Sequence, residues 1–498
     1  MRAADPPSPR PAIRRAGPAA AGRPPRATTA ILVIACTAQF MVILDVSIVN
    51  VALPAIRTEL HLGTAGQQWI VNAYTLGFAG LLLLGGRTAD LVGTRRAFLA
   101  GVTAFTLASL VGGLASGGPL LIAARAVQGV GGAVLAPATL TLIMRTFTEP
   151  AARTRAMGAW SAVMAAGGAV GGVIGGVLTE YAGWRWVLFV NVPIGAGLLA
   201  AAVACVPAAA SAPAGPRRLD LPGAVSVTAG LTALVHGTIA SETHGWGAPH
   251  VWGSFAAGVL LLAAFVAIEA RVAHPLVPLA ILRRRTLATA NLLVLGMGAA
   301  AFAMWFLLSL YFQQVLGQSA LGAGLSFLPG SLAIVVGAQV STRLIARTGP
   351  RPLIVTGMTI STAGLLWLSR IGDGGTGGGG AGGGAGAYAS AVLVPFFLAT
   401  LGAGLSLMPV TAAATSGTAP AEAGLASGLV NSSRQIGGAL GLAALATVAA
   451  HTTAARASGN AAGDLAAGYG RALLIASAFT ACAALGALAL PGRPRKSS

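Results

Sequence analysis

Residues 44–54 read LDVSIVNVALP and place one carboxylate, that of Asp45, inside a long apolar stretch. Asp45 is the only acidic residue well inside any of the long apolar segments, because the other eleven Asp and Glu lie in the N-terminal tail, in loops or at segment ends. A charged side chain at membrane depth costs about 2.5–3.5 kcal/mol on insertion scales, and such residues usually line an ion or substrate path. One buried acid among many apolar segments therefore predicts a transporter in which Asp45 carries a proton.

The composition indicates the class of protein. The chain has 498 residues, of which 55% are hydrophobic and 9% are charged, too few charges for the surface of a soluble protein of this length. Apolar stretches of about 20 residues recur, and each is long enough to cross a hydrocarbon core of about 30 Å. We expect an all-α polytopic membrane protein with fourteen transmembrane helices, near 30–52, 67–86, 97–115, 119–144, 157–178, 185–206, 221–240, 251–269, 287–312, 320–342, 352–369, 388–410, 424–448 and 469–490.

The positive charge is distributed unevenly between the two sides of these spans. The net charge is +19, and 24 of the 31 Lys and Arg fall on one side when the spans are threaded through a membrane. Cytoplasmic loops carry such an excess of Lys and Arg. We therefore expect a multi-pass protein of the cell membrane whose N- and C-termini are cytoplasmic, and no nucleic-acid partner.

A weak internal repeat suggests two related halves. Gly93, Arg95 and Gly101 match Gly349, Arg351 and Gly357 at a constant offset of 256 residues. The two copies join spans 2 and 3 and spans 10 and 11, which predicts a 6 + 2 + 6 order of helices, and repeated halves around a central site are a recurrent transporter plan. The expected domains are a basic Pro-rich tail at 1–29, a six-helix half at 30–206, a linker with two extra helices at 207–285, a second six-helix half at 286–490 with a Gly-rich external loop at 372–386, and a tail at 491–498.

Five motifs in this order resemble the major facilitator superfamily, and within it the fourteen-span drug:proton antiporters. They are LDVSIVNVALP at 44–54, GRTADLVGTRR at 86–96, RAVQGVG at 125–131, WRWVLFVNVP at 184–193 and SGLVNSSRQIGG at 427–438. Two positions depart from the family's pattern. Leu91 stands where a basic residue is usual, and the span 5 signature, which usually contains Gly-Pro, reads GGAVGGVIGG at 167–176, where the missing Pro weakens the inference of antiport.

The resemblance implies a major-facilitator-type helical bundle that exports small lipophilic compounds, such as drugs or antibiotics, in exchange for protons by alternating access. It also implies that the loop between spans 2 and 3 latches the two halves in one state, through Asp90, Gly93, Arg95 and Arg96. The alternative for this loop is a positively charged anchor that only sets topology.

Asp45 and Arg125 are the expected proton-coupling pair. Span 1 runs outward and span 4 runs inward, so at 1.5 Å per residue both side chains lie about 10 Å below the outer surface. Burial of the carboxylate and a nearby guanidinium act on its proton affinity in opposite directions. A change in water access or in their separation would therefore switch proton binding. The alternative is a fixed structural pair that only neutralises two buried charges.

Other polar and small residues are candidates for the substrate cavity and for helix packing. Arg434 has no acidic partner in the second half of the sequence, so it either faces the cavity, where it would contact substrate or Asp45, or bonds backbone carbonyls. Tyr and Trp near span ends are also explained as interfacial anchors. The cavity candidates are Gln39, Asn72, Tyr74, Gln128, Trp305, Asn431 and Arg434. The small residues of span 5 form two stripes with a four-residue spacing, which predicts a close seam, sliding or static, through Gly167, Gly171 and Gly175 and through Gly168, Gly172 and Gly176.

Several function classes are disfavoured. The sequence has no GxxxxGK[ST] loop, no nucleophile–base set and no Cys/His cluster. We therefore expect neither an enzyme nor ATP-driven transport, no metal and no cofactor other than the proton gradient. The expected partners are a lipophilic small molecule, protons and the lipid bilayer, and a monomer is expected. A dedicated metabolite exporter, a proton-coupled uptake carrier and a non-transporting receptor or scaffold remain as alternatives.

Overall fold

The computed structural model describes residues 25–207, 220–272, 275–372, 389–416, 422–456 and 458–490. Most of the predicted N-terminal tail, the segment 208–219, the Gly-rich loop from residue 373 onward and the C-terminal tail lie outside these ranges. Within them the structure is helical and contains no strand.

Fourteen helices of the described chain are long and apolar enough to cross a membrane, which confirms the predicted all-α polytopic class. Some spans are built from two consecutive elements. The first seven elements are α1 (Pro25–Glu59), α2 (Thr64–Val92), α3 (Thr94–Gly113), α4 (Gly118–Thr146), α5 (Pro150–Tyr181), α6 (Trp186–Phe189) and α7 (Asn191–Cys205). A second group comprises α8 (Leu221–His244), α9 (Pro249–Glu269) and the short α10 (Leu279–Leu282). The remainder comprises α11 (Arg285–Leu310) with a π turn (Tyr311–Val315), α12 (Ala320–Ser326), α13 (Leu328–Thr348), α14 (Pro350–Leu368) with a 3₁₀ turn (Ser369–Gly372), a second π turn (Ala389–Leu393), α16 (Val394–Thr415), α17 (Ala423–Arg456) and α18 (Ala461–Ala487).

Several helices extend beyond the predicted apolar spans. α5 begins at Pro150 rather than near residue 157, and α18 begins at Ala461 rather than near residue 469. Proline suits the first turn of a helix because its missing N–H has no partner there. At α18, the Asn460 side chain accepts a hydrogen bond from the backbone N–H of Gly463 at 3.1 Å. These first turns contain charged residues, Arg153 and Arg155 in α5 and Asp464 in α18, which interrupt the apolar pattern, so that pattern alone placed the boundaries too far along the chain.

The internal repeat is visible in the backbone. Gly93 between α2 and α3 has a φ of 91°, and Gly349 between α13 and α14 has a φ of 81°. Both values lie in the left-handed region that glycine adopts without steric cost. Further along, Gly101 packs against α4 and Gly357 against α16, each so closely that an added Cβ would meet backbone atoms. The two loops are therefore equivalent turns in two similarly packed helix groups.

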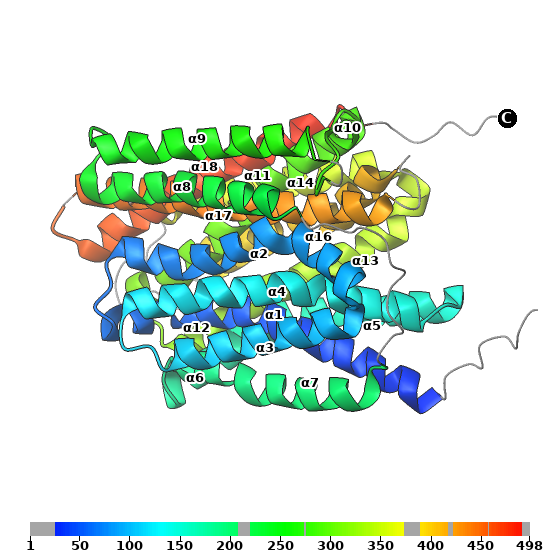
Figure 1. The fold of residues 1–498 in the computed structure, drawn as a ribbon. Helices are drawn as coiled ribbons and strands as arrows, with labels where there is room; N and C mark the ends of the chain where they lie inside the picture. The colour runs from blue at the N-terminus through cyan, green and yellow to red at the C-terminus, as the bar shows by residue number, and fades with distance from the viewer. Residues whose placement is uncertain are drawn as a thin grey trace, which may run out of the picture.

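The helices pack as two groups with a hairpin beside them. In the first group α2 and α3 pack on α4, and α1 packs on α5; in the second, α11 and α18 pack on α17, and α13 and α14 pack on α16. α8 and α9 form a hairpin that lies against α2 and α17 at the edge of the bundle (Figure 1). α8 runs four residues past its predicted end, which brings Glu242 within reach of α2, where Gln68 Nε2 donates to it at 2.8 Å and the Thr64 hydroxyl also donates.

The two ends of the bundle differ in how the halves meet. We call the end where α1 begins and α18 ends the termini face, at the right of Figure 1, and the other end the opposite face. Near the opposite face, Ser309 Oγ of α11 donates to the Asn50 carbonyl of α1 at 2.6 Å, and Gln313 Nε2 donates to the Val51 carbonyl at 3.0 Å. One hydrophobic cluster there contains residues of both halves, among them Ile48, Leu53, Phe312 and Phe327. The opposite face is therefore sealed.

The two glycine stripes of α5 have different neighbours. Gly167, Gly171 and Gly175 pack against Ile43, Ser47 and Ile48 of α1, within the first half. Gly172 and Gly176 meet Gly324 and Ala320 of α12, in the second half, whereas Gly168 has no atom within 4 Å of an added Cβ. The halves thus touch along this stripe near the opposite face and part along it toward the termini face, where Leu83 of α2 still packs on Gly428 of α17.

Gly176→Leu should open the seal at the opposite face. A Cβ at this position would lie 2.6 Å from the Ala320 carbonyl oxygen and 2.7 Å from Leu321 Cα, which are backbone atoms that cannot rotate away. The distance between spin labels at Tyr181 and Leu325, both exposed, should increase relative to the parent protein when measured by pulsed electron paramagnetic resonance. Gly168→Leu is the matched control and should leave the distance unchanged, since its side chain has free space. An unchanged distance in the Gly176 variant would refute the sealing role of this contact.

Candidate functional site

Asp45 and Arg125 form a buried ion pair between α1 and α4. Arg125 Nη1 lies 2.5 Å from Asp45 Oδ2, and the two residues are 2% and 0% exposed. The Arg125 guanidinium also lies over the Tyr74 ring at 4.4 Å and donates from Nε to the Ile70 carbonyl at 3.4 Å. Asp45 and Arg125, which the sequence predicted to lie at equal depth, are therefore in direct contact.

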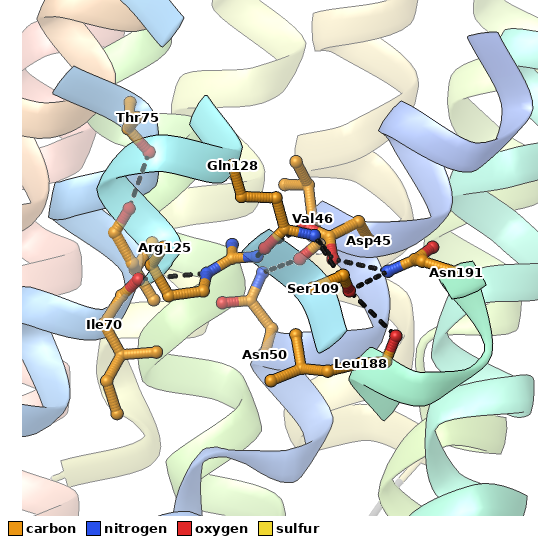
Figure 2. Close-up of polar contacts among 11 residues, drawn as sticks. Asp45, Val46, Asn50, Ile70, Thr75, Ser109, Arg125, Gln128, Leu188 and Asn191 are labelled. Carbon is orange, nitrogen blue, oxygen red and sulfur yellow. Dashed lines mark hydrogen bonds and ion pairs between the residues drawn. The ribbon is translucent and has the colours of Figure 1, made fainter. Parts of the chain in front are cut away.

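The second carboxylate oxygen of Asp45 is held by two amides (Figure 2). Gln128 Nε2 donates to Asp45 Oδ1 at 2.7 Å, and Asn191 Nδ2 donates to the same oxygen at 3.0 Å. Gln128 Oε1 in turn accepts from Arg125 Nη1 at 2.7 Å. Ionised carboxylates accept hydrogen bonds only, and three donors from two helices satisfy this one well. Both carboxylate oxygens of Asp45 are therefore occupied by donors in this conformation.

Two members of this network, Ser109 and Asn191, were not predicted as site residues. Ser109 Oγ of α3 lies 3.0 Å from Asn191 Nδ2 and 3.3 Å from Gln128 Nε2, and it donates to the Leu188 carbonyl at 2.8 Å. Asn191 stands at the start of α7, where the chain breaks from α6, so this break directs its amide into the bundle. The sequence signal for Asn191 was a polar side chain inside an apolar span. A serine in an apolar helix, such as Ser109, gives almost no such signal.

The predicted cavity residues of the first half lie inside the packed helices. Gln128 and Tyr74 belong to the surroundings of the ion pair. The Gln39 side chain accepts from Thr139 Oγ1 at 3.4 Å between α1 and α4. Asn72 is fully buried in α2, and neither amide atom has a hydrogen-bond partner among the described residues. The structure therefore places these four side chains in helix interfaces rather than on an open surface.

The predicted residues of the second half are partly exposed. Trp305 of α11 packs against Phe327 and Phe396, with ring centroids 4.9 and 5.4 Å away. Asn431 and Arg434 lie on α17, where Arg434 Nη2 donates to Asn431 Oδ1 at 2.9 Å. Arg434 does not contact Asp45, whose partners are described above.

The loop predicted as a latch is a tight turn at the termini face. Gly93 makes the turn, and Arg95 Nη2 donates to the Val203 carbonyl of α7 at 2.8 Å. Arg96 is exposed, and the side chain of Asp90 lies outside the described part of the structure. Arg95 thus joins α3 to the end of α7 within one half. Among the described residues no group of His, Cys, Asp and Glu has the arrangement of a metal site.

Comparison with known proteins identifies the family. The family model described as "Major Facilitator Superfamily" matches residues 35–442, which include the ion pair and most helices of both halves. The chain belongs to the major facilitator superfamily. This membership makes the chain a transport protein rather than an enzyme, and its fourteen spans make it a multi-pass membrane protein.

Relatives within the superfamily cover nearly the whole chain. The cephamycin export protein CmcT of Amycolatopsis lactamdurans is 44% identical over 471 residues, which are 94% of this chain and 93% of that protein. The puromycin resistance protein pur8 of Streptomyces alboniger is 41% identical, over 85% of this chain and 82% of its own length. A solved structure of the POT family transporter PepTSo superposes with a TM-score of 0.67 at 14% identity, over 94% of this chain and 99% of that one, which shows a shared fold.

In this superfamily member, Asp45→Asn and Arg125→Met should each reduce stability, and the double variant should recover most of the loss. Each single change leaves one buried charge without its partner, a cost of about 3–5 kcal/mol, whereas the double change removes both charges. The measurement is thermal or denaturant unfolding in detergent, analysed as a double-mutant cycle.

The matched control is the Glu59–Arg185 pair at the opposite face, whose side chains are 51% and 35% exposed. Because solvent screens exposed pairs, Arg185→Met should change stability by about 1 kcal/mol or less. Additive losses in the Asp45/Arg125 double variant would show that the two charges do not stabilise each other.

Proposed function

We propose that this chain is a proton-coupled antiporter that exports small lipophilic compounds of the antibiotic type across the cell membrane. Relatives named for cephamycin export and puromycin resistance support export of such compounds. The excess of Lys and Arg supports a cytoplasmic termini face, with the opposite face outside the cell. In this orientation the contacts of α1 and α5 with the second half lie toward the outside, and α5 parts from the second half toward the cytoplasm while α2 and α17 stay in contact, which supports entry of substrate from inside along α5.

The single observation that carries proton coupling is the position of Asp45 on α1. Asn50 and Val51, whose carbonyls accept the hydrogen bonds from α11 and from the π turn that follows it, come about one and a half helical turns after Asp45. A shift of α1 at Asp45 is therefore transmitted directly to the contact that closes the outer side.

Protonation of Asp45 supplies such a shift. A neutral carboxyl group no longer attracts Arg125, and its new O–H needs an acceptor in place of the donors that now surround it. The network must rearrange, and α1 with it. Because Asp45 is fully buried here, a proton reaches it only after the helices move, so access and protonation change together. This is the alternating exposure that exchange of a proton for substrate requires.

The proton gradient supplies enough free energy for this exchange. One charge crossing 100 mV yields about 2.3 kcal/mol, and each pH unit adds about 1.4 kcal/mol. One or two protons would sustain a concentration ratio of tens to thousands, so we propose the gradient rather than ATP as the energy source.

Asp45→Asn should abolish export driven by a pH gradient. The amide resembles the protonated acid but cannot release a proton, so the cycle stops in one state. Efflux of puromycin, of a cephamycin and of a lipophilic dye would be measured in proteoliposomes with an imposed pH gradient, per molecule of folded protein. The expected rate is that of liposomes without protein.

Glu149→Gln is the matched control, since Glu149 is an exposed acid at the start of α5 and should not be needed. Gradient-driven efflux by the Asp45 variant at the wild-type rate would remove Asp45 from the coupling mechanism.

A further inference from the structure

Arg434 carries a positive charge deep inside the second half of the bundle. The carbonyl oxygen of Arg434 lies against Gly298, in the middle of α11. Ser309 of α11 is level with Asn50 of α1, to which it is hydrogen-bonded. Counting residues along both helices from this contact places Arg434 about 9 Å nearer the termini face than Asp45. Two charged positions thus occupy different depths of the membrane.

Within the described chain, Arg434 has no carboxylate within ion-pair distance. Three arginines lie at membrane depth: Arg125 is paired with Asp45, Arg471 is exposed on the outside of the bundle, and Arg434 has one side-chain hydrogen bond, to Asn431. A guanidinium has five N–H donors, so most of those on Arg434 are unused. The guanidinium nitrogens of Arg434 that make no hydrogen bond are not fully buried, so they remain accessible. Charged side chains inside a membrane protein usually mark a substrate or ion path.

The pair lies on a side of α17 between its contacts with α11 and its contacts with α2 and α8. Gly437 and Gly441 contact Leu295 and Ala299 of α11, and Ala439 and Ala443 join a cluster with α2 and α8. At 100° per residue, Asn431 and Gln435 point between these two contact surfaces, and the Arg434 guanidinium reaches toward Asn431. Both members of the pair are partly exposed.

The chemistry of the pair is that of an anion site. Arginine has no acceptor, so Asn431 must offer its oxygen to Arg434, and its Nδ2 hydrogens then point elsewhere. The exposed groups are therefore all donors: the free guanidinium N–H groups and the Asn431 amide. A planar guanidinium with an adjacent amide suits the two oxygens of a carboxylate.

We propose that Arg434 and Asn431 bind a carboxylate of the exported compound, so that the transporter selects anionic substrates. This inference rests on the proposed export function and names its substrate class. The bound carboxylate supplies the counter-charge that the protein itself does not provide at this depth. An inside-negative membrane potential would drive such an anion outward and a proton inward, so both movements would use the same gradient.

The test compares an acid with its neutral ester. The probes are cefoxitin, a cephamycin with one carboxylate, its methyl ester, and the cation puromycin. Equilibrium binding to purified protein in detergent is measured by calorimetry and needs no gradient. Wild-type protein should bind the acid more tightly than the ester by about 10-fold or more, the value of one charge-assisted hydrogen bond. Arg434→Gln should bring the ratio near one, and Arg434→Lys should retain part of it.

A second variant separates loss of binding from loss of folding. Asn431→Asp places a carboxylate beside Arg434, so the protein supplies its own counter-charge and should fold at least as well as the wild type, while losing preference for the acid. Arg456→Gln removes an exposed arginine from the end of the same helix and should change neither affinity. Equal affinity for acid and ester in the wild type, no binding of cefoxitin, or an unchanged ratio in Arg434→Gln would each overturn the proposal.

The outcomes also distinguish this proposal from the proposed function. Gradient-driven export of puromycin without any preference for the acid would refute the carboxylate subsite and leave export standing. Preference for the acid that depends on Arg434, together with no gradient-driven export of any probe, would support the subsite and refute proton-coupled export.

Discussion

The ion pair between Asp45 and Arg125 is the interaction on which the arrangement of the first half depends. Both charges are buried at membrane depth, where an unpaired charge is costly. α1 and α4 must therefore keep the register that brings the two side chains together. Gln128, Asn191 and Ser109 extend this constraint to α3 and α7, so that one carboxylate fixes the relative positions of four helices. Only a change in its protonation or a movement of those helices can release it.

α1 connects this network to the boundary between the halves. The side chain of Asp45 faces α4 and α7, while the carbonyls of Asn50 and Val51 accept hydrogen bonds from α11 and from the π turn that follows it. α5 also contacts both halves, since one of its glycine stripes packs on α1 and the other meets α12. Two helices, α1 and α5, therefore link the buried charge to the sealed face. Their backbones are closely packed, so a local movement is transmitted to the neighbouring helix instead of being absorbed.

The second half differs from the first in how its polar groups are used. Arg434, its less exposed cation at membrane depth, is accompanied by an amide instead of an acid, and an aromatic cluster of Trp305, Phe327 and Phe396 lies near the sealed face. The α8–α9 hairpin packs outside both halves, and the described contacts of Asp45 and Arg434 do not involve it. The proposed function and the proposed carboxylate subsite would together divide the tasks, with proton chemistry in the first half and substrate recognition in the second.

The sequence by itself determined the class, the number of spans and the residue at the centre of the network. Long apolar segments leave no alternative to membrane helices, because backbone polar groups must be satisfied inside each segment, and a lone carboxylate in such a segment is conspicuous. The motif residues Arg125 and Gln128 were recognised as well, although Gln128 was assigned to the cavity and lies in the ion-pair network instead. Helix starts at Pro150 and Ala461 were placed too late because charged residues in the first turns, Arg153 and Arg155 in α5 and Asp464 in α18, interrupt the apolar pattern.

Only the tertiary structure decided which polar residues meet. Ser109 and Asn191 come from helices far from Asp45 in the sequence, and a hydropathy pattern does not record which side of a buried helix faces which neighbour. The same limit applies to the glycine stripes, whose spacing is identical in the sequence. One stripe packs within a half and the other lies between the halves, since the rotation of α5 about its axis is fixed by its contacts with α1 and α12.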